Sequence, residues 1–141
     1  MIVRRVSGGK FDRTSHPKWK YRLSEHLVLW TSHRVEEPIL IRSSSGYLIG
    51  EWQGNLLTIF SGYMYDGATG WPDHKEAMVG FAFHDFGYQL SQILTRLQWD
   101  QGMKSLHEQA NYKLRHVVFA GVRLGGWKFF GKSEPVRIIE I

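Results

Sequence analysis

The segment HDFGY places His84 and Asp85 side by side, and Asp100 follows on what reads as the next helix. Histidine is the side chain best suited to accept a proton near neutral pH. A carboxylate bonded to its other ring nitrogen fixes the tautomer and stabilises the imidazolium. If two antiparallel helices carry these residues, His84 meets Asp100, and the pair can act as a general base with its orienting carboxylate.

Asp85 points about 100° round the same helix from His84, toward a glycine-rich loop. The carboxylates of Asp85 and Asp66 and the backbone carbonyls of residues 67–70 form a set of oxygen donors. Such donors suit calcium, whereas the absence of cysteine and the single nearby histidine fit zinc less well. A calcium ion there would stabilise an oxyanion while His84 activates water, which is ester hydrolysis without a covalent intermediate.

The elements that must position these side chains begin with a β-rich half. Residues 20–65 hold short runs rich in Tyr, Leu, Ile and Trp, separated by Ser-Gly and Gly-Asn, which predicts an antiparallel sheet. Gly54-Asn55 is the predicted hairpin turn, because both residues tolerate a positive φ. Pro38 is predicted to start a strand.

The hydrophobic period changes to that of a helix after residues 66–73. Apolar and aromatic residues at helical spacing predict a first helix from about His74 to about Leu94. Asp73 is the expected N-cap of this helix, and Glu76, three residues later, would complete a capping box.

A second helix is predicted to start after Arg96 and to loosen between Gly121 and Gly126. One side of it carries Asp100, Met103, Leu106, Ala110, Leu114, Val117 and Val118. The short segment 95–98 would join it to the first helix. We therefore predict an α+β fold, in which an N-terminal antiparallel β-sheet is followed by two long antiparallel helices. We expect one domain, 1–141, with a β-rich part at 1–65 and a loop plus helical part at 66–141.

The composition is that of a folded protein with a basic surface. Hydrophobic residues make up 43% of the 141, which supports a core and excludes a disordered chain. The formal net charge of +5 favours anionic partners. The chain has no cysteine, so packing rather than disulfides must stabilise it. No signal peptide and no apolar run near the roughly 18 residues of a spanning helix is evident, so a membrane would be reached only from its surface or by release.

The stretch DGATGWPD, residues 66–73, followed by HDFGY, residues 84–88, resembles the calcium loop and catalytic helix of the bacterial and fungal secreted phospholipases A2. RLQWDQGMKSL, residues 96–106, is similar to the family's next element, in which an Asp on the antiparallel helix pairs with the catalytic His. NYKLRHVVFAGVRLGG, residues 111–126, is similar to the family's last helix. The resemblance covers roughly the C-terminal half of the chain.

This resemblance implies a phospholipase A2-like helical core and calcium-dependent hydrolysis of a phospholipid acyl ester. The site residues that it implies are His84 as general base, Asp100 as its partner, Tyr88 as a supporting residue, and Asp66, Asp85 and the Gly67 carbonyl as calcium ligands. A phospholipid or membrane surface is the expected partner. Nucleic acid is not expected, because the sequence has no basic stripe or recognisable binding motif.

Two features depart from the secreted enzymes. Those enzymes crosslink their two helices by disulfides, whereas this chain must hold them by packing of Phe81, Phe83, Leu90, Met103, Leu106 and Leu114. The interval from His84 to Asp100 is also shorter here.

The same His-Asp pair, Tyr and later Asp, preceded by an Asp-Gly-Ala turn and a β-rich start, also resembles an uncharacterised family of small phage and prophage proteins. This second resemblance covers nearly the whole chain, and it accounts for the N-terminal sheet and the missing cysteines. It implies a protein made in the host cytoplasm without a signal peptide, which either associates with the virion or acts at the host membrane.

Other interpretations stay open. A phage structural or lysis-accessory protein could keep the fold without catalysis. Trp127, Phe129 and Phe130, beside Lys128 and Lys132, would then dock a membrane or partner, or pack as a C-terminal turn beside the sheet.

An HD-type metal phosphohydrolase is a less favoured alternative, because it needs another His on an earlier helix and a later Asp. A helix His bonded to a carboxylate is also often structural. The remaining histidines, His16, His26, His33, His74, His107 and His116, have no ligand spacing and are expected to face solvent.

Overall fold

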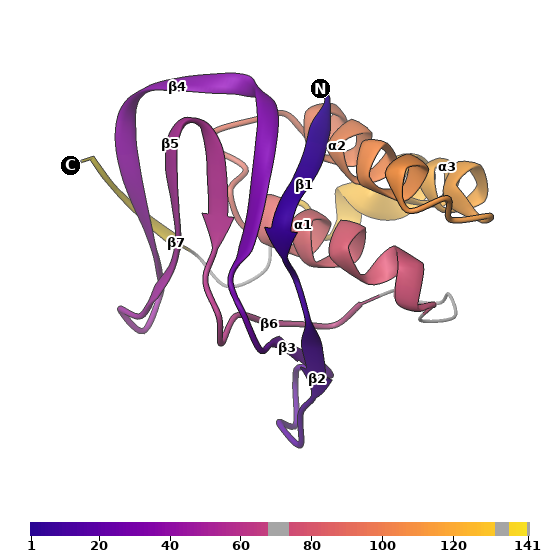
Figure 1. The fold of residues 1–141 in the computed structure, drawn as a ribbon, viewed down its shortest axis with the longest axis horizontal. Helices are drawn as coiled ribbons and strands as arrows, with labels where there is room; N and C mark the ends of the chain where they lie inside the picture. Colours follow the sequence, from indigo (N-terminus) through magenta and orange to yellow (C-terminus); the bar gives the residue numbers. More distant parts are fainter. Residues whose placement is uncertain (68–73, 132–135, 141) are drawn as a thin grey trace.

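Two long strands, β4 (Leu27–Ser43) and β5 (Leu48–Ile59), form the centre of the sheet in the computed structural model, which describes residues 1–67, 74–131 and 136–140. Much of each strand alternates buried with more exposed residues, as expected where one face covers a core. The strands pair antiparallel and are joined by a short turn at residues 44–47. Figure 1 shows them as two nested arches, with β5 as the inner one.

Both strands bend halfway along. The register between them shifts between Trp30 and Val35 and again between Val35 and Ile39. Pro38 lies in the second shift, where its missing N–H does not break the ladder. Gly54 pairs with Val35 and has a φ of 56°, which lets β5 bend without ending. Two predictions are therefore wrong, because Pro38 lies inside β4 and Gly54-Asn55 lies inside β5 rather than at a hairpin turn.

Five further strands complete the sheets in the described part of the chain. β1 (Val3–Gly8) pairs with the first half of β4, and β7 (Val136–Glu140) pairs with its second half. A separate small sheet has the order β2 (Phe11–Arg13), β3 (Tyr21–Leu23) and β6 (Met64–Tyr65). The predicted antiparallel sheet in the N-terminal half is confirmed, whereas the C-terminal strand β7 was not predicted.

Three α-helices follow β6 along the described chain and pack on one side of the arches (Figure 1). They are α1 (Met78–Tyr88), α2 (Arg96–Gln109) and α3 (Arg115–Gly125), with the short 3-10 helices η1 (Lys75–Ala77) before α1 and η2 (Gly126–Lys128) after α3. The predicted α+β fold, a sheet followed by antiparallel helices, is confirmed; the segment predicted as the second helix is divided into α2 and α3.

The first helix is shorter than predicted. His74, rather than Asp73, occupies the N-cap position of η1, so the capping-box position falls on Ala77 instead of Glu76. Asp73 itself lies outside the described residues. The helix ends at Tyr88, and a series of turns follows up to Leu94. Leu94 is still buried, which explains why the hydrophobic pattern continued past the helix end.

The segment 95–98, predicted to link the helices, is the start of α2. Thr95 is its N-cap and forms a capping box with Gln98. The predicted second helix then ends at Gln109, because Asn111 adopts a φ of 53° and reverses the chain direction before α3. Gly121 lies within α3, so the helix does not loosen there as predicted.

Close packing holds α1 against α2 in place of disulfides. Gly80 lies against His107, and Gly87 lies against Trp99, so the two helices run antiparallel. A methyl group on either glycine would overlap the ring that faces it, so only glycine allows this approach. Five of the six side chains expected to pack here, Phe81, Phe83, Leu90, Met103 and Leu106, are buried, and Leu114 is half-buried.

Candidate active site

α1 and α2 bring His84 and Asp100 together at their shared interface. Nε2 of His84 lies 2.7 Å from Oδ1 of Asp100. Asp100 is fully buried, and His84 is 8% exposed. The predicted contact is confirmed. The short interval of 16 residues is enough to reverse the chain, because α1 ends only four residues after His84.

Asp100 has three further polar neighbours. The hydroxyl of Tyr88 donates a hydrogen bond of 2.6 Å to Oδ1, the oxygen that also faces His84. Nη1 of Arg123, from α3, donates to Oδ2 at 2.7 Å. Nη1 of Arg96 lies 3.7 Å from the same Oδ2. The carboxylate therefore joins residues from all three helices.

These contacts fix the protonation state of Asp100. Burial alone would raise its pKa, but hydrogen bonds from His84, Tyr88 and Arg123 outweigh burial and hold the pKa below its usual value. The pKa of Tyr88 is raised, first by burial and then by its hydrogen bond to Asp100. Asp100 is thus an ionised acceptor, and Tyr88 is a protonated donor.

The ionised carboxylate determines the tautomer of His84. Because a carboxylate can only accept, the shared proton belongs to Nε2 of His84. Nδ1 then carries the lone pair of the neutral ring, and it has no hydrogen-bond partner among the residues that the structure describes. The His84 ring lines a cavity of about 570 Å³, so the side chain that carries the Nδ1 lone pair is part of the cavity wall.

That cavity lies between the three helices and the segments around residues 18–19 and 66–67. Apolar side chains in its wall are Trp19, Phe81, Met103, Val118, Val122 and Phe129. Charged or titratable side chains there are Lys18, Tyr63, Asp66, His84, Asp85, Tyr88 and Lys128. A mainly apolar cavity with a few polar groups suits an amphiphilic molecule.

A second, larger depression of about 920 Å³ lies elsewhere, between β1, β2 and the starts of the helical elements. Its lining includes Arg5, Lys10, Glu25 and Lys75, and it contains none of the predicted site residues. The smaller cavity is the candidate site, because its wall includes His84, whose ring bonds to the buried Asp100.

The two predicted calcium carboxylates line the same cavity. Oδ2 of Asp85 accepts a hydrogen bond of 3.1 Å from the backbone N–H of Asp66. Burial raises the pKa of Asp66, and the charges of Lys20 and Lys18 act in the opposite direction. This hydrogen bond joins Asp85 to the main chain of Asp66, whereas the prediction placed both carboxylates on one ion.

The oxygen ligands available here are of the kind that a hard cation prefers. Asp66 and Asp85 offer carboxylate oxygens, and Gly67 is buried beside them. In the described part of the chain, no group of three or more His, Asp or Glu side chains is arranged to hold a metal ion. Calcium takes six to eight oxygens, so backbone carbonyls and water would have to supply most of its ligands. The remaining loop residues, 68–70, lie outside the described residues.

Sequence reasoning missed Arg96 and Arg123. Arg96 precedes Asp100 by four residues, so a helical i, i+4 pair could have been recognised. Arg123 reaches Asp100 only because the chain reverses at Asn111, and no local pattern signals that contact.

The expectation that His107 faces solvent is wrong. It is fully buried between α1 and α2, and its Nε2 lies 3.0 Å from the carbonyl oxygen of Ala77. The rings of Phe81 and Tyr112 contact it edge-on. Burial lowers the pKa of His107 to about 4. Of the other five, His16, His26, His74 and His116 are exposed and His33 is half-buried.

Phe129 and Phe130 lie at the site rather than beside the sheet. Phe130 is half-buried and meets Tyr88 edge-on, with ring centroids 5.2 Å apart. Phe129 is 57% exposed at the cavity. The side chain of Trp127, and Lys132, lie outside the described residues.

The phosphohydrolase alternative gains no support from this geometry. It requires a second histidine beside His84 and Asp85, but the nearest upstream candidate, His74, packs against Tyr112. His84 bonds to Asp100 instead, through the nitrogen that the geometry assigns a proton.

No helix within the described residues is both long and apolar enough to cross a membrane. Comparisons with family models, with curated proteins and with solved structures found no match to this chain.

Proposed function

We propose that the protein is a calcium-dependent, phospholipase A2-like hydrolase of lipid acyl esters, of phage or prophage origin. One observation carries the proposal: the buried, ionised Asp100 holds Nε2 of His84, and Nδ1 remains available at the cavity. In the phage setting, the protein would be made in the host cytoplasm and would act at the host membrane or from the virion.

The residues of the chain suggest how the reaction would proceed. Nδ1 of His84 accepts a proton from water as the water oxygen attacks the ester carbonyl carbon. Asp100 stabilises the imidazolium that forms, and Tyr88 holds the carboxylate through Oδ1. When the bond to the leaving alkoxide breaks, His84 returns the proton to it. The products are a fatty acid and a lysolipid.

Asp66, Asp85 and the Gly67 carbonyl are the residues that would hold calcium. When bound, calcium supplies Lewis-acid stabilisation of the negative charge on the ester oxygen. Burial beside the cavity and the raised pKa of Asp66 are consistent with a carboxylate that gains from a nearby cation.

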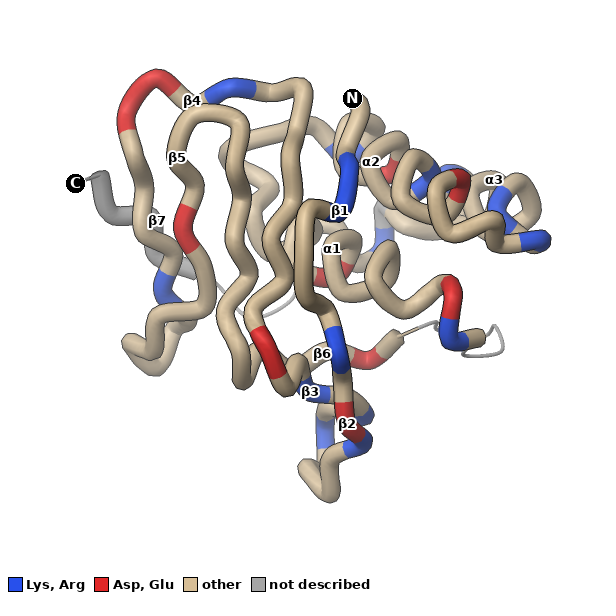
Figure 2. Tube along the Cα trace, in the orientation of Figure 1, with Lys and Arg blue, Asp and Glu red and all other residues tan. Residues whose placement is uncertain are grey.

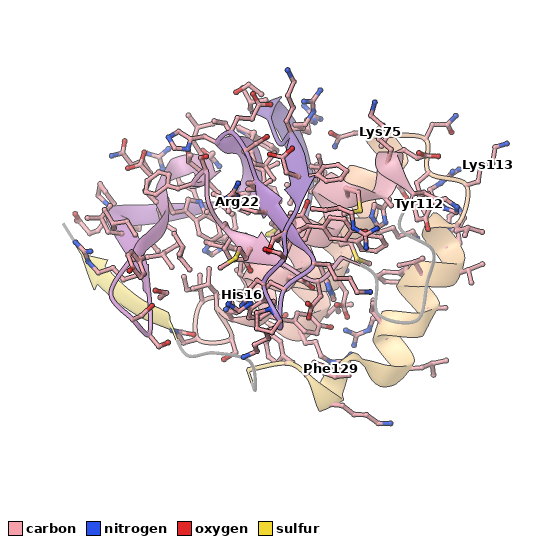
Figure 3. All side chains as sticks on the ribbon, turned by 90° about the horizontal axis from the view of Figure 1, so that it is seen from below. His16, Arg22, Lys75, Tyr112, Lys113 and Phe129 are labelled. Carbon is pink, nitrogen blue, oxygen red and sulfur yellow. The ribbon has the colours of Figure 1, made fainter. Side chains whose placement is uncertain are left out.

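A basic, partly apolar surface beside the cavity supports a membrane as the partner. Val117 is 50% exposed and Leu124 is 81% exposed on α3, and Phe129 follows just beyond the helix (Figure 3). Between Glu108 and Glu134 the sequence has five Lys or Arg residues and no acidic residue. Figure 2 colours the Lys and Arg residues of the described helical side blue. Exposed apolar groups among cations suit an anionic lipid surface.

The decisive experiment measures fatty acid release from vesicles that contain anionic phospholipid, with calcium or with a chelator. The proposal predicts release with calcium, and a loss of at least about a hundredfold in His84→Ala, because a general base contributes that much. His116→Ala, which removes an exposed histidine of α3, is the matched control and should retain activity.

The alternative is a catalytically silent structural or lysis-accessory protein. It is favoured by one observation: Asp100 ties the three helices together whether or not His84 reacts. Folded wild-type protein that releases no fatty acid from any head group in the presence of calcium would support this alternative and overturn the enzymatic one.

A further inference from the structure

The C-terminal end of α3 is held against the buried carboxylate by two arginines from different helices. Arg123, in the last turns of α3, donates through Nη1 to Oδ2 of Asp100 at 2.7 Å. Arg96, at the start of α2, donates in the other direction, to the carbonyl oxygens of Val122 at 2.8 Å and of Arg123 at 3.2 Å. Each arginine thus joins α3 to the helix that carries Asp100.

The chain that follows α3 closes over the same cluster. A methyl group on Gly126 would overlap the hydroxyl of Tyr88, so the backbone itself covers that hydroxyl. The backbone N–H of Gly131 donates to the carbonyl oxygen of Tyr88 at 2.9 Å. The Phe130 ring packs on the Tyr88 ring. Asp100 is therefore fully buried beneath a segment that begins at Arg123.

Each oxygen of Asp100 has a separate set of partners. Oδ1 accepts from His84 and Tyr88, and Oδ2 accepts from Arg123, with Arg96 more distant. A carboxylate held at only one oxygen can rotate about its χ2 torsion, which is a broad, soft torsion. A donor fixed on Oδ2 prevents that rotation and keeps Oδ1 directed at the imidazole.

We infer that Arg123 is a positioning residue for the reaction: from α3 it fixes the Asp100 carboxylate, and through it the His84 ring. The kinetic consequence of this inference rests on the proposed function, whereas its structural consequence does not. It makes correct docking of α3 a condition for an ordered His84 at the cavity. Arg123 itself takes no part in proton transfer.

The test compares Arg123→Gln and Arg123→Lys with Arg115→Gln. Arg115 is the control, because it lies on the same helix but donates to the carbonyl oxygen of Tyr112 and does not contact Asp100. The first measurement is NMR of protein labelled with ¹⁵N-histidine, without lipid or metal. It observes whether the Nε2 proton of His84 is slow to exchange and whether the ring keeps one tautomer.

His107 serves as an internal standard in the same spectra, since its Nε2 bonds to the carbonyl oxygen of Ala77 away from Arg123. In Arg123→Gln the His84 signal should broaden or exchange faster while the His107 signal stays unchanged. Arg123→Lys, which keeps a cationic donor, should restore part of the His84 signal. Arg115→Gln should leave both signals as in the wild type.

Fatty acid release then tests the kinetic part. Arg123→Gln should lower kcat between about tenfold and a hundredfold with KM nearly constant, because a misplaced base slows chemistry rather than binding. An unchanged His84 signal in folded Arg123→Gln overturns the inference. Loss of both histidine signals would show a general structural role and also overturn it. If the wild type releases no fatty acid, the proposed function fails, and the NMR result still decides the positioning role.

Discussion

His84 and His107 are both buried at the interface between α1 and α2, and they differ in what they contact. His84, on α1, reaches across to the carboxylate of Asp100 on α2. His107, on α2, reaches back to the neutral carbonyl of Ala77 before α1, and its Nδ1 is buried without a hydrogen-bond partner among the described residues. One ring lines a cavity, and the other is enclosed by Phe81, Tyr112 and Gly80.

The comparison shows that the partner, rather than the residue type or its burial, distinguishes the environments of the two histidines. The partner of His84 is an ionised carboxylate, whereas that of His107 is an uncharged carbonyl. A neutral carbonyl in an apolar enclosure does not offset desolvation, so the pKa of His107 falls to about 4 and the ring stays uncharged near neutral pH. Three changes would break or sharpen this contrast.

The largest effect is expected for Asp100→Asn. The amide leaves Arg123 and the ring of His84 without their anionic partner in a buried site, and removal of one member of such a group typically costs about 3–5 kcal/mol of folding free energy. Urea unfolding measures the loss. Glu108→Gln, which changes an exposed acid on the same helix, should cost less than about 0.5 kcal/mol. A loss from Asp100→Asn as small as that of the control would contradict the central role of the carboxylate.

Acid should destabilise the folded protein through His107. The pKa of His107 is about 4 in the folded state and near 6.5 in the unfolded state, so the unfolded state binds more protons between these values. The stability that neutral His107 provides is complete above about pH 6.5 and is lost as the pH falls toward 4, by roughly 3 kcal/mol in all.

Unfolding free energies of the wild type and of His107→Gln, measured from pH 7 to pH 4, isolate this effect. Gln stays neutral and can still donate to Ala77, while Asp66 and the other carboxyl groups titrate in both proteins. Between pH 7 and pH 4 the wild type should lose about 3 kcal/mol more unfolding free energy than His107→Gln does. Parallel curves would mean that protonation of His107 does not oppose folding.

The smallest of the three effects concerns the fit around His107. Gly80→Ala places a methyl group into the imidazole, and overpacking of this kind costs about 1–3 kcal/mol. Gly125→Ala is the control, since no atom lies within 4 Å of its new methyl group. In a double-mutant cycle, His107→Ala should remove most of the penalty of Gly80→Ala. Strict additivity would show that the two positions do not share one packing site.

The sequence was sufficient to predict the part of the site that lies on α1 and α2. Helical spacing and a short connection oblige His84 and Asp100 to meet, because antiparallel neighbours face each other across a fixed distance. The position of Asp85 toward the Asp66 loop follows from the same geometry. The short runs rich in Tyr, Leu, Ile and Trp in residues 20–65, separated by Ser-Gly and Gly-Asn, likewise predict antiparallel strands.

The missed features depend on contacts between distant segments. Asn111 ends α2 by adopting a left-handed conformation that asparagine allows but does not require, so α3 and Arg123 could not be placed. His107 is surrounded by apolar residues only after α1 packs on it, and nothing beside it in sequence indicates this. The bends at Pro38 and Gly54 use residues that elsewhere mark chain reversals, because bent strands and turns need the same backbone conformations.

The pairing of β7 with β4 has a consequence for folding. Ile39, Leu40 and Ile41 of β4 pair with residues 138–140, about a hundred residues later in the chain, so this contact raises the contact order of the fold. While the chain is being synthesised, β5 can pair with one edge of β4 long before β7 exists. The other edge of this apolar segment then stays open, and an open apolar edge is a template for intermolecular strand pairing. β7, which is made after the other described strands, therefore closes the edge through which nascent copies of the protein would associate.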